Sequence, residues 1–254
     1  MDGSAANTAA NTAANTAANT AANTAASSVA SDRIADALRT AILDGSYAPG
    51  TRIRQEDVAA QSGASRIPVR EAFRLLASEG LVTLVANTGA WVTRLSMAEC
   101  VETYLIRERL EPLLLRRSLP NLDEAAIARL AELAAAMAEL TAPMARPGAG
   151  VPEFLRLDRE FHLLSYAGAP PGETPQIIGR MWNTTQHYRR EFTKLAAGGR
   201  AGGGTGAGME VTHLEHRLLL DCIRRRDADD GERVLVTHIR RTRLALQRHP
   251  EIFG

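Results

Sequence analysis

Residues 63–74 read Gly-Ala-Ser-Arg-Ile-Pro-Val-Arg-Glu-Ala-Phe-Arg, and this stretch decides how the first third of the chain folds. Ser65 is a favourable residue immediately before a helix, and Pro68 falls in the first turn, where a missing N–H costs little. The apolar side chains that follow recur with helical spacing and form one stripe: Val69, Ala72, Phe73 and Leu76. The stretch therefore predicts a helix with one buried face.

Arg66 and Arg70 lie off this stripe, near the start of the predicted helix. A guanidinium group can bridge the edge of a guanine or clamp a phosphate, so exposed arginines at a helix start are typical of a DNA-recognition helix. Taken alone, the stretch fits an ordinary amphipathic helix with solvated arginines equally well, and its neighbours decide between the two.

The preceding residues predict two more helices. Residues 32–44 carry apolar side chains on one face, and Pro49-Gly50 marks a turn. Residues 54–61 form a short second helix, and Ser62-Gly63 breaks the chain before the helix that starts near Ser65. This order of helix, short helix, tight turn and helix is the helix-turn-helix arrangement.

Two β-prone runs follow the third helix. Residues 81–85 and 90–93 are rich in valine, leucine, threonine and tryptophan, and Asn87-Thr88-Gly89 between them is a turn signal. They predict a small β-hairpin wing. Residues 29–95 are thus expected to form a winged helix-turn-helix domain that binds DNA.

These motifs resemble the N-terminal domain of GntR-family transcriptional regulators over residues 32–95. The resemblance implies that Ser65, Arg66 and Arg70 contact operator DNA, that Gly89 lies at the wing tip near the minor groove, and that Ile67 influences sequence preference. Three further arginines are expected either to touch phosphates or only to solvate the surface: Arg52, Arg54 and Arg74.

Composition limits the other possibilities. The 254 residues are 45% hydrophobic, which allows a substantial core in one or two domains. The two cysteines, Cys100 and Cys222, match no metal motif and argue for a reducing compartment. No apolar run is long enough to span a membrane and no signal peptide is evident, so the sequence predicts a cytoplasmic protein with no membrane partner. The net charge of +1 means that DNA affinity must come from arginines on one face, doubled in a homodimer.

The first 28 residues differ from the rest. Ala-Ala-Asn-Thr occurs five times in succession from Ala5 to Thr24, with no large apolar side chain. Such a segment cannot bury enough surface to offset its chain entropy, so residues 1–28 are expected to be a disordered tail. A tail that modulates the encounter with DNA is the alternative, although it lacks basic charge.

Residues 96–250 are expected to form an all-α antiparallel bundle, so the fold class is mainly α. Two loops are predicted, at residues 143–148 and at the glycine-rich residues 198–208. The expected helices cover residues 97–118, 123–140, 152–167, 174–196, 209–226 and 228–248.

Within this bundle, Asp158 and His162 are four residues apart and share a helix face, while His216 and His238 lie on later helices. Three imidazoles and a carboxylate converging inside a bundle suit a divalent transition metal such as Zn²⁺, Ni²⁺ or Mn²⁺. Only the Asp158/His162 pair is local in sequence, so packed or surface histidines are the alternative.

The bundle resembles the FCD effector domain of the FadR subfamily of GntR regulators over residues 97–245. The resemblance rests on four motifs: Tyr104 to Glu111, Asp158-x-x-Phe161-His162, Glu215-His216, and Asp227 to His238. It implies that Asp158, His162, His216 and His238 hold a metal, with His213 as a substitute or supporting group and His187 and His249 at the surface. Arg107 matches an arginine that faces the family's cavity. That arginine is expected either to bind an effector carboxylate or to pair with Glu111 on its own helix.

One segment departs from the family pattern. Residues 167–173 read Ala-Gly-Ala-Pro-Pro-Gly-Glu where relatives show Gly-Asn, so the identity of the effector does not carry over. The resemblance implies a ligand-responsive regulator, by family default a repressor, that binds a pseudo-palindromic operator as a homodimer and senses a small carboxylate.

Two other functions were considered for the bundle. A metal sensor without an organic effector would use the same four residues. A metal-dependent hydrolase would need a general base, and Glu160 and Glu215 are both expected to point away from the metal. Since the chain also lacks the H-E-x-x-H motif, it is not expected to be an enzyme and no catalytic residue is predicted.

Overall fold

The computed structural model describes residues 27–86, 89–141, 150–197 and 207–253. The chain divides into two units, Met1–Thr93 and Arg94–Gly254. The repeat tail up to residue 26, the turn residues Asn87 and Thr88 and the loop at 143–148 lie outside the described residues, as does the second predicted loop up to residue 206.

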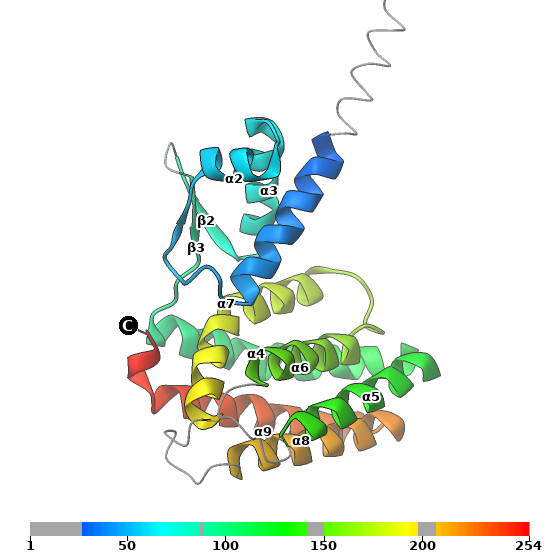
Figure 1. The fold of residues 1–254 in the computed structure, drawn as a ribbon. Coiled ribbons are helices and arrows are strands. Elements are labelled where there is room, and N and C mark those ends of the chain that lie inside the picture. The colour runs from blue at the N-terminus through cyan, green and yellow to red at the C-terminus, as the bar shows by residue number, and fades with distance from the viewer. Residues whose placement is uncertain (1–26, 87–88, 142–149, 198–206, 254) are drawn as a thin grey trace, which may run out of the picture. The chain divides into compact units, whose positions relative to one another are not determined.

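The N-terminal unit contains the predicted helix-turn-helix (Figure 1). The first helix is described over residues 27–43, α2 covers Gln55–Ser62 and α3 covers Arg66–Ser78. The turn between α2 and α3 contains Gly63 at φ +63°, a left-handed conformation that glycine adopts without strain. The core of the unit includes the predicted stripe of α3 packed with apolar residues of the first helix: Ile34, Ala35, Leu38, Val69, Ala72, Phe73 and Leu76.

The wing is part of a three-stranded antiparallel sheet with the order β1-β3-β2. Strands β2 (Val82–Val85) and β3 (Gly89–Val92) form the predicted hairpin, in which Val82 pairs with Val92 and Val85 pairs with Gly89. The third strand, β1 (Arg52–Ile53), was not expected, because two residues are too few to show an alternating pattern.

The C-terminal unit is all-helical, as predicted. Its elements are α4 (Met97–Ser118), η1 (Leu119–Asn121), α5 (Glu124–Thr141), α6 (Val151–Ser165), α7 (Glu173–Ala197), α8 (Ala207–Arg224), α9 (Ala228–Gln247) and η2 (Pro250–Phe253). Two helix starts are fixed by side chains: Ser96 and Glu99 form a capping box on α4, and Asp227 caps α9.

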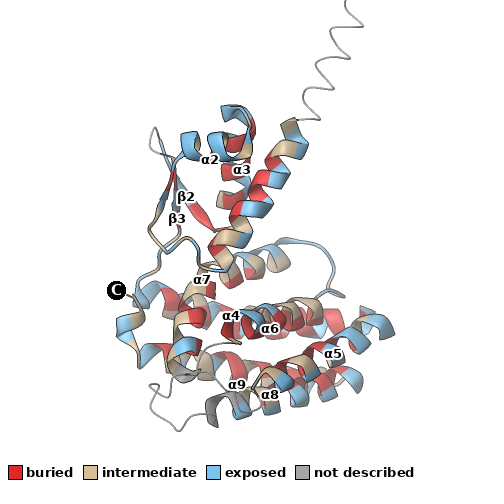
Figure 2. Ribbon diagram, in the orientation of Figure 1, coloured by how far each residue is buried: buried red, intermediate tan, exposed pale blue. Residues whose placement is uncertain are grey.

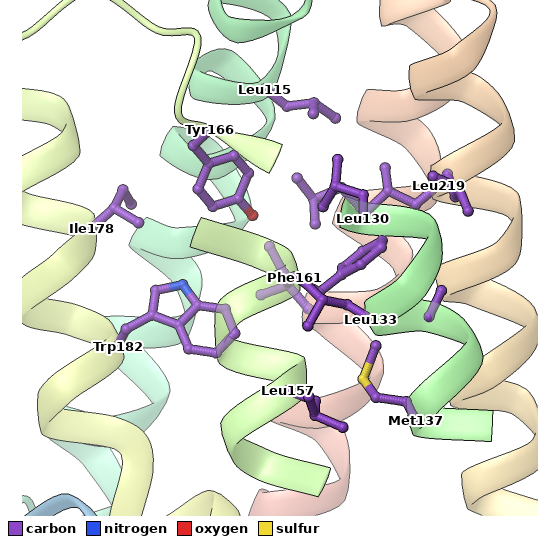
Figure 3. Packing of buried hydrophobic residues seen from close by; sticks show 14 of the residues in the cluster. Leu115, Leu130, Leu133, Met137, Leu157, Phe161, Tyr166, Ile178, Trp182 and Leu219 are labelled. Carbon is purple, nitrogen blue, oxygen red and sulfur yellow. The ribbon is translucent and has the colours of Figure 1, made fainter. Parts of the chain in front are cut away.

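The helices of this unit enclose one apolar core, with buried residues on their inner faces (Figure 2). Helix α4 packs along α9, while α5 packs against α6 and α8. Phe161 of α6 lies with Leu130 and Leu133 of α5 on one side and Trp182 of α7 on the other (Figure 3). This packing fixes α6, α7, α8 and α9, which carry the candidate site of the bundle. Within the described residues, every helix is too short or too polar to cross a membrane.

Candidate functional site

The exposed surface at the start of α3 contains four of the residues predicted to bind DNA. Ser65 has the extended backbone of a helix N-cap, but its hydroxyl makes no capping hydrogen bond. Ser65, Arg66 and Arg70 are exposed, and Ile67 is 66% exposed although it is apolar. The opposite face of α3 is buried in the core of the unit. The helix therefore presents these four side chains outward.

The charge at this helix start favours an anionic partner. The first turn of α3 has no acidic residue, and its free backbone N–H groups add a partial positive charge. Arg66 is only loosely paired, at 3.8 Å from Glu56, and both side chains are mostly exposed. Arg74, one turn after Arg70, is held 2.5 Å from Glu71. Arg66 can therefore turn toward a phosphate or a base edge more easily than Arg74 can.

Gly89 begins β3 at the end of the hairpin. Its φ is +105°, and a Cβ at this position would lie 2.8 Å from the carbonyl oxygen of Ile53 in β1. The structure thus requires glycine here for packing of the sheet, independently of any contact with DNA. Arg52 and Arg54, two of the three arginines expected either to touch phosphates or only to solvate the surface, are exposed.

The second site lies inside the bundle, where the four predicted metal ligands come together. Asp158 and His162 of α6, His216 of α8 and His238 of α9 each offer one ligand atom, and these atoms lie within 4.8 Å of one another. All four side chains are buried. Three imidazole nitrogens and one carboxylate oxygen form a donor set that Zn²⁺, Ni²⁺ and Mn²⁺ accept.

The two carboxylate oxygens of Asp158 have different partners. Oδ2 accepts a hydrogen bond from Arg189 of α7, while Oδ1 lies 3.1 Å from Nε2 of His216 and 3.8 Å from Nε2 of His162. Burial alone would raise the pKa of this carboxyl, but the Arg189 guanidinium and the two histidines hold it well below its usual value. Asp158 is therefore ionised and turns one oxygen toward the imidazoles.

The histidine rings meet through their Nε2 atoms. Nε2 of His216 is 3.2 Å from Nε2 of His162, and the Nδ1 atoms of both rings are buried with no hydrogen-bond partner among the described residues. Burial, opposed by Asp158, keeps the pKa of His162 well below its usual value, so this imidazole is neutral. Two ring nitrogens facing each other beside a carboxylate form an arrangement that a cation between them would satisfy. The four residues are therefore chemically suited to bind a divalent metal.

Glu215 contacts the ring of His238 at Nδ1, on the side away from the other two histidines. This Nδ1 lies 2.7 Å from Oε2 of Glu215, and Arg241 donates to both oxygens of Glu215 at 2.8 and 2.5 Å. Glu215 thus contacts a proposed ligand from the side away from the cluster, a contact that was not predicted from the sequence. Arg241 lowers the pKa of Glu215 to about 2, with His238 as a second cause, although burial opposes both. Glu160 does point away, since it pairs with Arg129 and Arg156.

A small cavity of about 80 Å³ borders the cluster. Asp158 and His238 form part of its wall, and two arginines face it, Arg189 and Arg241. The remaining wall is made of apolar and hydroxyl side chains: Phe154, Leu155, Phe192, Thr193, Thr212 and Thr242. Both guanidinium groups are already paired, Arg189 with Asp158 and Arg241 with Glu215, so a small organic anion in this space would share them with these carboxylates.

Arg107, the predicted effector-binding residue, is buried in an ion pair. Its Nε lies 2.5 Å from Oε1 of Glu111, and Tyr166 donates to the other oxygen of that carboxylate at 2.6 Å. The guanidinium group also lies over the rings of Tyr104 and Trp182. Of the two roles considered for Arg107, this geometry corresponds to the pair on its own helix, and Arg107 is not among the residues that line the cavity.

The three remaining histidines differ from expectation in part. His213 is not among the four clustered ligands and makes an edge contact with the ring of Phe154. His187 and His249 are half-buried rather than fully at the surface, with Arg190 and Glu251 as their respective partners.

Neither Arg189 and Arg241 nor the role of Glu215 was predicted from the sequence. A signal for Arg189 does exist in the sequence. One face of α7 is buried and largely polar, and its residues recur at helical spacing: Trp182, Thr185, Gln186, Arg189 and Thr193. A polar face turned toward a core indicates an internal site, because buried polar groups need partners there.

Comparisons with known proteins agree with this architecture. Residues 102–241 match the FCD domain, and residues 30–92 match the gntR family of bacterial regulatory proteins. An uncharacterized HTH-type transcriptional regulator of Streptomyces ambofaciens is 29% identical over 227 residues, which cover 85% of this chain and 86% of the relative. The HTH-type transcriptional repressor RspR of Escherichia coli is 26% identical over 203 residues, which cover 80% and 82% of the two chains. The solved structure of McbR/YncC from Escherichia coli shares the fold, with a TM-score of 0.70 at 19% identity over 87% of this chain and 98% of that chain.

Proposed function

Because this chain belongs to the GntR family of bacterial regulatory proteins and carries an FCD domain, we propose that it is a ligand-responsive transcriptional repressor. Its family and its relatives are transcriptional regulators, and the chain is not an enzyme. In this proposal, residues 29–95 bind operator DNA, residues 96–250 bind the effector and form a homodimer, and the protein works in the cytoplasm, where the bacterial chromosome lies.

The DNA-binding part of the proposal rests on the exposed start of α3. Arg66 and Arg70 would contact base edges or phosphates, Ser65 would contact the phosphate backbone, and Ile67 would touch the apolar edge of a base. Gly89 would bring the hairpin backbone close to the minor groove. Two copies of this surface in a homodimer would read a pseudo-palindromic operator.

The sensing part rests on the cluster of Asp158, His162, His216 and His238, whose converging donor atoms are the observation that carries the proposal. A divalent cation held there supplies positive charge and an open coordination position for an anionic oxygen. Arg189 and Arg241 face the neighbouring cavity, where they would attract a small carboxylate. Arg107 would serve the effector only by leaving Glu111.

The effector regulates DNA binding only if it prefers one arrangement of the DNA-binding domains over the other. A 100-fold change in operator affinity requires about 2.7 kcal/mol of coupling between the two sites. One bidentate contact between a carboxylate and an arginine, made in one arrangement only, is of that order.

Selection from a pool of random DNA duplexes tests the DNA-binding part. We expect the enriched sequences to contain an inverted repeat, and we expect Arg70→Ala to weaken binding to it at least tenfold in fluorescence anisotropy. Arg156→Ala is the matched control, since it removes the same charge from the surface of the bundle. Equal affinities of both variants and the wild type would contradict the proposed role of α3.

Calorimetric titration of metal-loaded protein with a panel of small carboxylic acids tests the sensing part. We expect micromolar binding of at least one acid, release of the selected duplex by that acid, and loss of both effects in His216→Ala. Binding that survives in His216→Ala would assign the metal a structural role and move the effector site to the cavity wall with Arg189 and Arg241, or to an Arg107 released from Glu111.

A second candidate function is metal sensing without an organic effector. Two observations favour it: the cavity is only about 80 Å³, and Arg107 is already neutralised by Glu111. This function predicts that affinity for the selected duplex follows the concentration of free Zn²⁺, Ni²⁺ or Mn²⁺ with no acid present. Duplex affinity that is constant across metal concentrations would exclude it.

A further inference from the structure

Glu215 is the one acid in direct contact with a ring nitrogen of the proposed metal ligands other than Asp158 itself, among the residues that the structure describes. We propose that Glu215 and Arg241 form a positioning pair that fixes the ring orientation and tautomer of His238. The inference rests on the proposed function, because it concerns the metal site assigned there.

The contact itself determines the tautomer of His238. Oε2 of Glu215 lies 2.7 Å from Nδ1 of the ring, and an ionised carboxylate can only accept a hydrogen bond. Nδ1 therefore carries the hydrogen and Nε2 carries the lone pair. Nε2 is then free to face the cluster with His162 and His216, whose rings lie 4.9 and 5.1 Å from that of His238.

The other two histidines have no carboxylate at Nδ1, and His216 approaches Asp158 through Nε2 instead. Nδ1 of His162 and Nδ1 of His216 are both buried without a hydrogen-bond partner among the described residues. Their rings are held by packing against Phe161, and in the case of His162 also against Trp182. Among the three histidines, His238 is therefore the one that a carboxylate holds at Nδ1, which leaves the lone pair of Nε2 for a metal. Such carboxylate–histidine pairs raise the basicity of the ligand as well as orienting it.

Arg241 keeps Glu215 in place. It donates to both carboxylate oxygens, and its second NH2 contact is to Oγ1 of Thr212 at 2.8 Å, one turn before Glu215 on α8. The carboxylate is thereby held between α8 and α9. Arg241 also faces the cavity, so an anion bound there would compete with Glu215 for the same guanidinium group.

Imidazole NMR on the metal-free protein tests the pair directly. Two-bond ¹H–¹⁵N correlations distinguish a ring protonated at Nδ1 from one protonated at Nε2. We expect His238 to be an Nδ1–H tautomer in the wild type and to lose that preference in Glu215→Ala. Glu215→Gln retains an oxygen acceptor and should keep the tautomer, which also provides a readout if Glu215→Ala fails to fold. An Nε2–H tautomer in the wild type, or an unchanged one in Glu215→Ala, would overturn the proposal.

Zn²⁺ affinity, measured in competition with a chromophoric chelator, gives the second readout. We expect Glu215→Ala to weaken Zn²⁺ binding about 10- to 100-fold and Glu215→Gln to weaken it less. The matched control is Glu108→Ala, because Glu108 is equally buried and is also held by arginines of α9, Arg240 and Arg243, but touches none of the proposed ligands. If Glu215→Ala and Glu108→Ala weaken binding equally, the effect is structural and the proposal fails.

The two readouts separate this inference from the proposed function. A wild-type protein that shows the Nδ1–H tautomer but binds none of Zn²⁺, Ni²⁺ and Mn²⁺ would remove the metal site from the proposed function and leave the pair in place. If the wild-type protein binds Zn²⁺ and Glu215→Ala binds it equally well, the metal site of the proposed function stands and the positioning pair is excluded.

Discussion

Asp158 is the only proposed metal ligand with a formal negative charge, and Arg189 determines how the bundle accommodates that charge. The carboxylate is 1% exposed, where an isolated ion would be strongly unfavourable. Arg189 is itself buried and lies over the ring of Trp182 while it donates to Oδ2. The pair keeps Asp158 ionised without a metal, and it leaves Oδ1 available for one.

Replacing Arg189 tests this role through stability. Arg189→Met leaves the buried Asp158 carboxylate without its cation, so we expect the free energy of unfolding of the metal-free protein to fall by about 3–5 kcal/mol in urea denaturation. Arg156→Met removes an exposed guanidinium paired with Glu153 and Glu160 and should cost less than about 1 kcal/mol. Equal losses in the two variants would show that the Asp158–Arg189 pair contributes nothing particular.

Gly168 occupies the segment where the sequence departs from the family pattern. A Cβ there would lie 2.4 Å from the carbonyl oxygen of Ser118, and the backbone N–H and carbonyl of Gly168 bond to the side chains of Ser118 and Asn121. We expect Gly168→Ala to lower the free energy of unfolding by about 1–3 kcal/mol, because the backbone at the end of α4 and in η1 cannot yield as a side chain can. Gly179→Ala in α7 meets nothing within 4 Å and should stabilise the protein by up to about 1 kcal/mol. A Gly168→Ala protein as stable as the wild type would show that this segment shifts freely.

At the scale of elements, the sequence predicted helices better than strands. The apolar stripe of α3 is a local signal, and both α3 and α4 were predicted within one or two residues of their observed bounds. The first helix extends at least five residues before its predicted start, since Ser27 to Ser31 carry little apolar pattern. Strand β1 exists only through its pairing with β3, which no local pattern of two residues can indicate.

The candidate site could be predicted only as far as spacing and resemblance allowed. Asp158 and His162 are one helical turn apart, but the approach of His216 and His238 depends on how α8 and α9 pack. The direction of Glu215 depends on the same packing. Its neighbour His216 faces the cluster, so Glu215 was expected to face away. From that side it reaches His238 on the adjacent helix, because α9 passes close to that edge of α8.

Helix α7 also contains a group whose titration should affect stability. Burial and the neighbouring Arg190 lower the pKa of His187 to about 4. The unfolded chain takes up a proton near pH 6.5 and the folded chain does not until about pH 4, so this group costs stability as the pH falls through that window and has no effect above it.

Comparing the wild type with His187→Gln isolates this contribution, because the other groups titrate in both proteins. We expect the difference in free energy of unfolding to change by about 1 kcal/mol between pH 7 and pH 4.5, with the wild type losing more, after allowance for the partial exposure of the ring. Parallel pH profiles in urea denaturation would contradict the assigned pKa.

The molecule as a whole contains two separate apolar cores, one in each unit. All four proposed metal ligands belong to the second unit, Arg94–Gly254, and the residues proposed to contact DNA belong to the first. A signal that starts at the metal must therefore reach a domain with its own core. If the proposed function is right, we expect such a signal to change the arrangement of folded units rather than the folding of either.

Differential scanning calorimetry tests this independence. Zn²⁺ at 100 times its Kd stabilises the unit that binds it by about 2.7 kcal/mol, which corresponds to a rise in Tm of about 5–10 °C for a unit of this size. We expect one transition to rise by this amount and the other to stay fixed, and His216→Ala to abolish the shift. Two transitions that rise together would show that the units unfold as one.

The two tryptophans of the chain are divided between the units. Trp91 lies on β3 and is 37% exposed, whereas Trp182 is buried, with the guanidinium groups of Arg107 and Arg189 over its ring and the ring of His162 at 5.2 Å. The protein thus contains a natural fluorophore beside the proposed metal site and another in the wing. In a Trp91→Phe protein, the remaining emission would come from Trp182 alone, and paramagnetic Ni²⁺ bound at His162 would quench it. Occupancy of the proposed metal site could then be followed through the fluorescence of Trp182, without an added label, while the protein is bound to DNA.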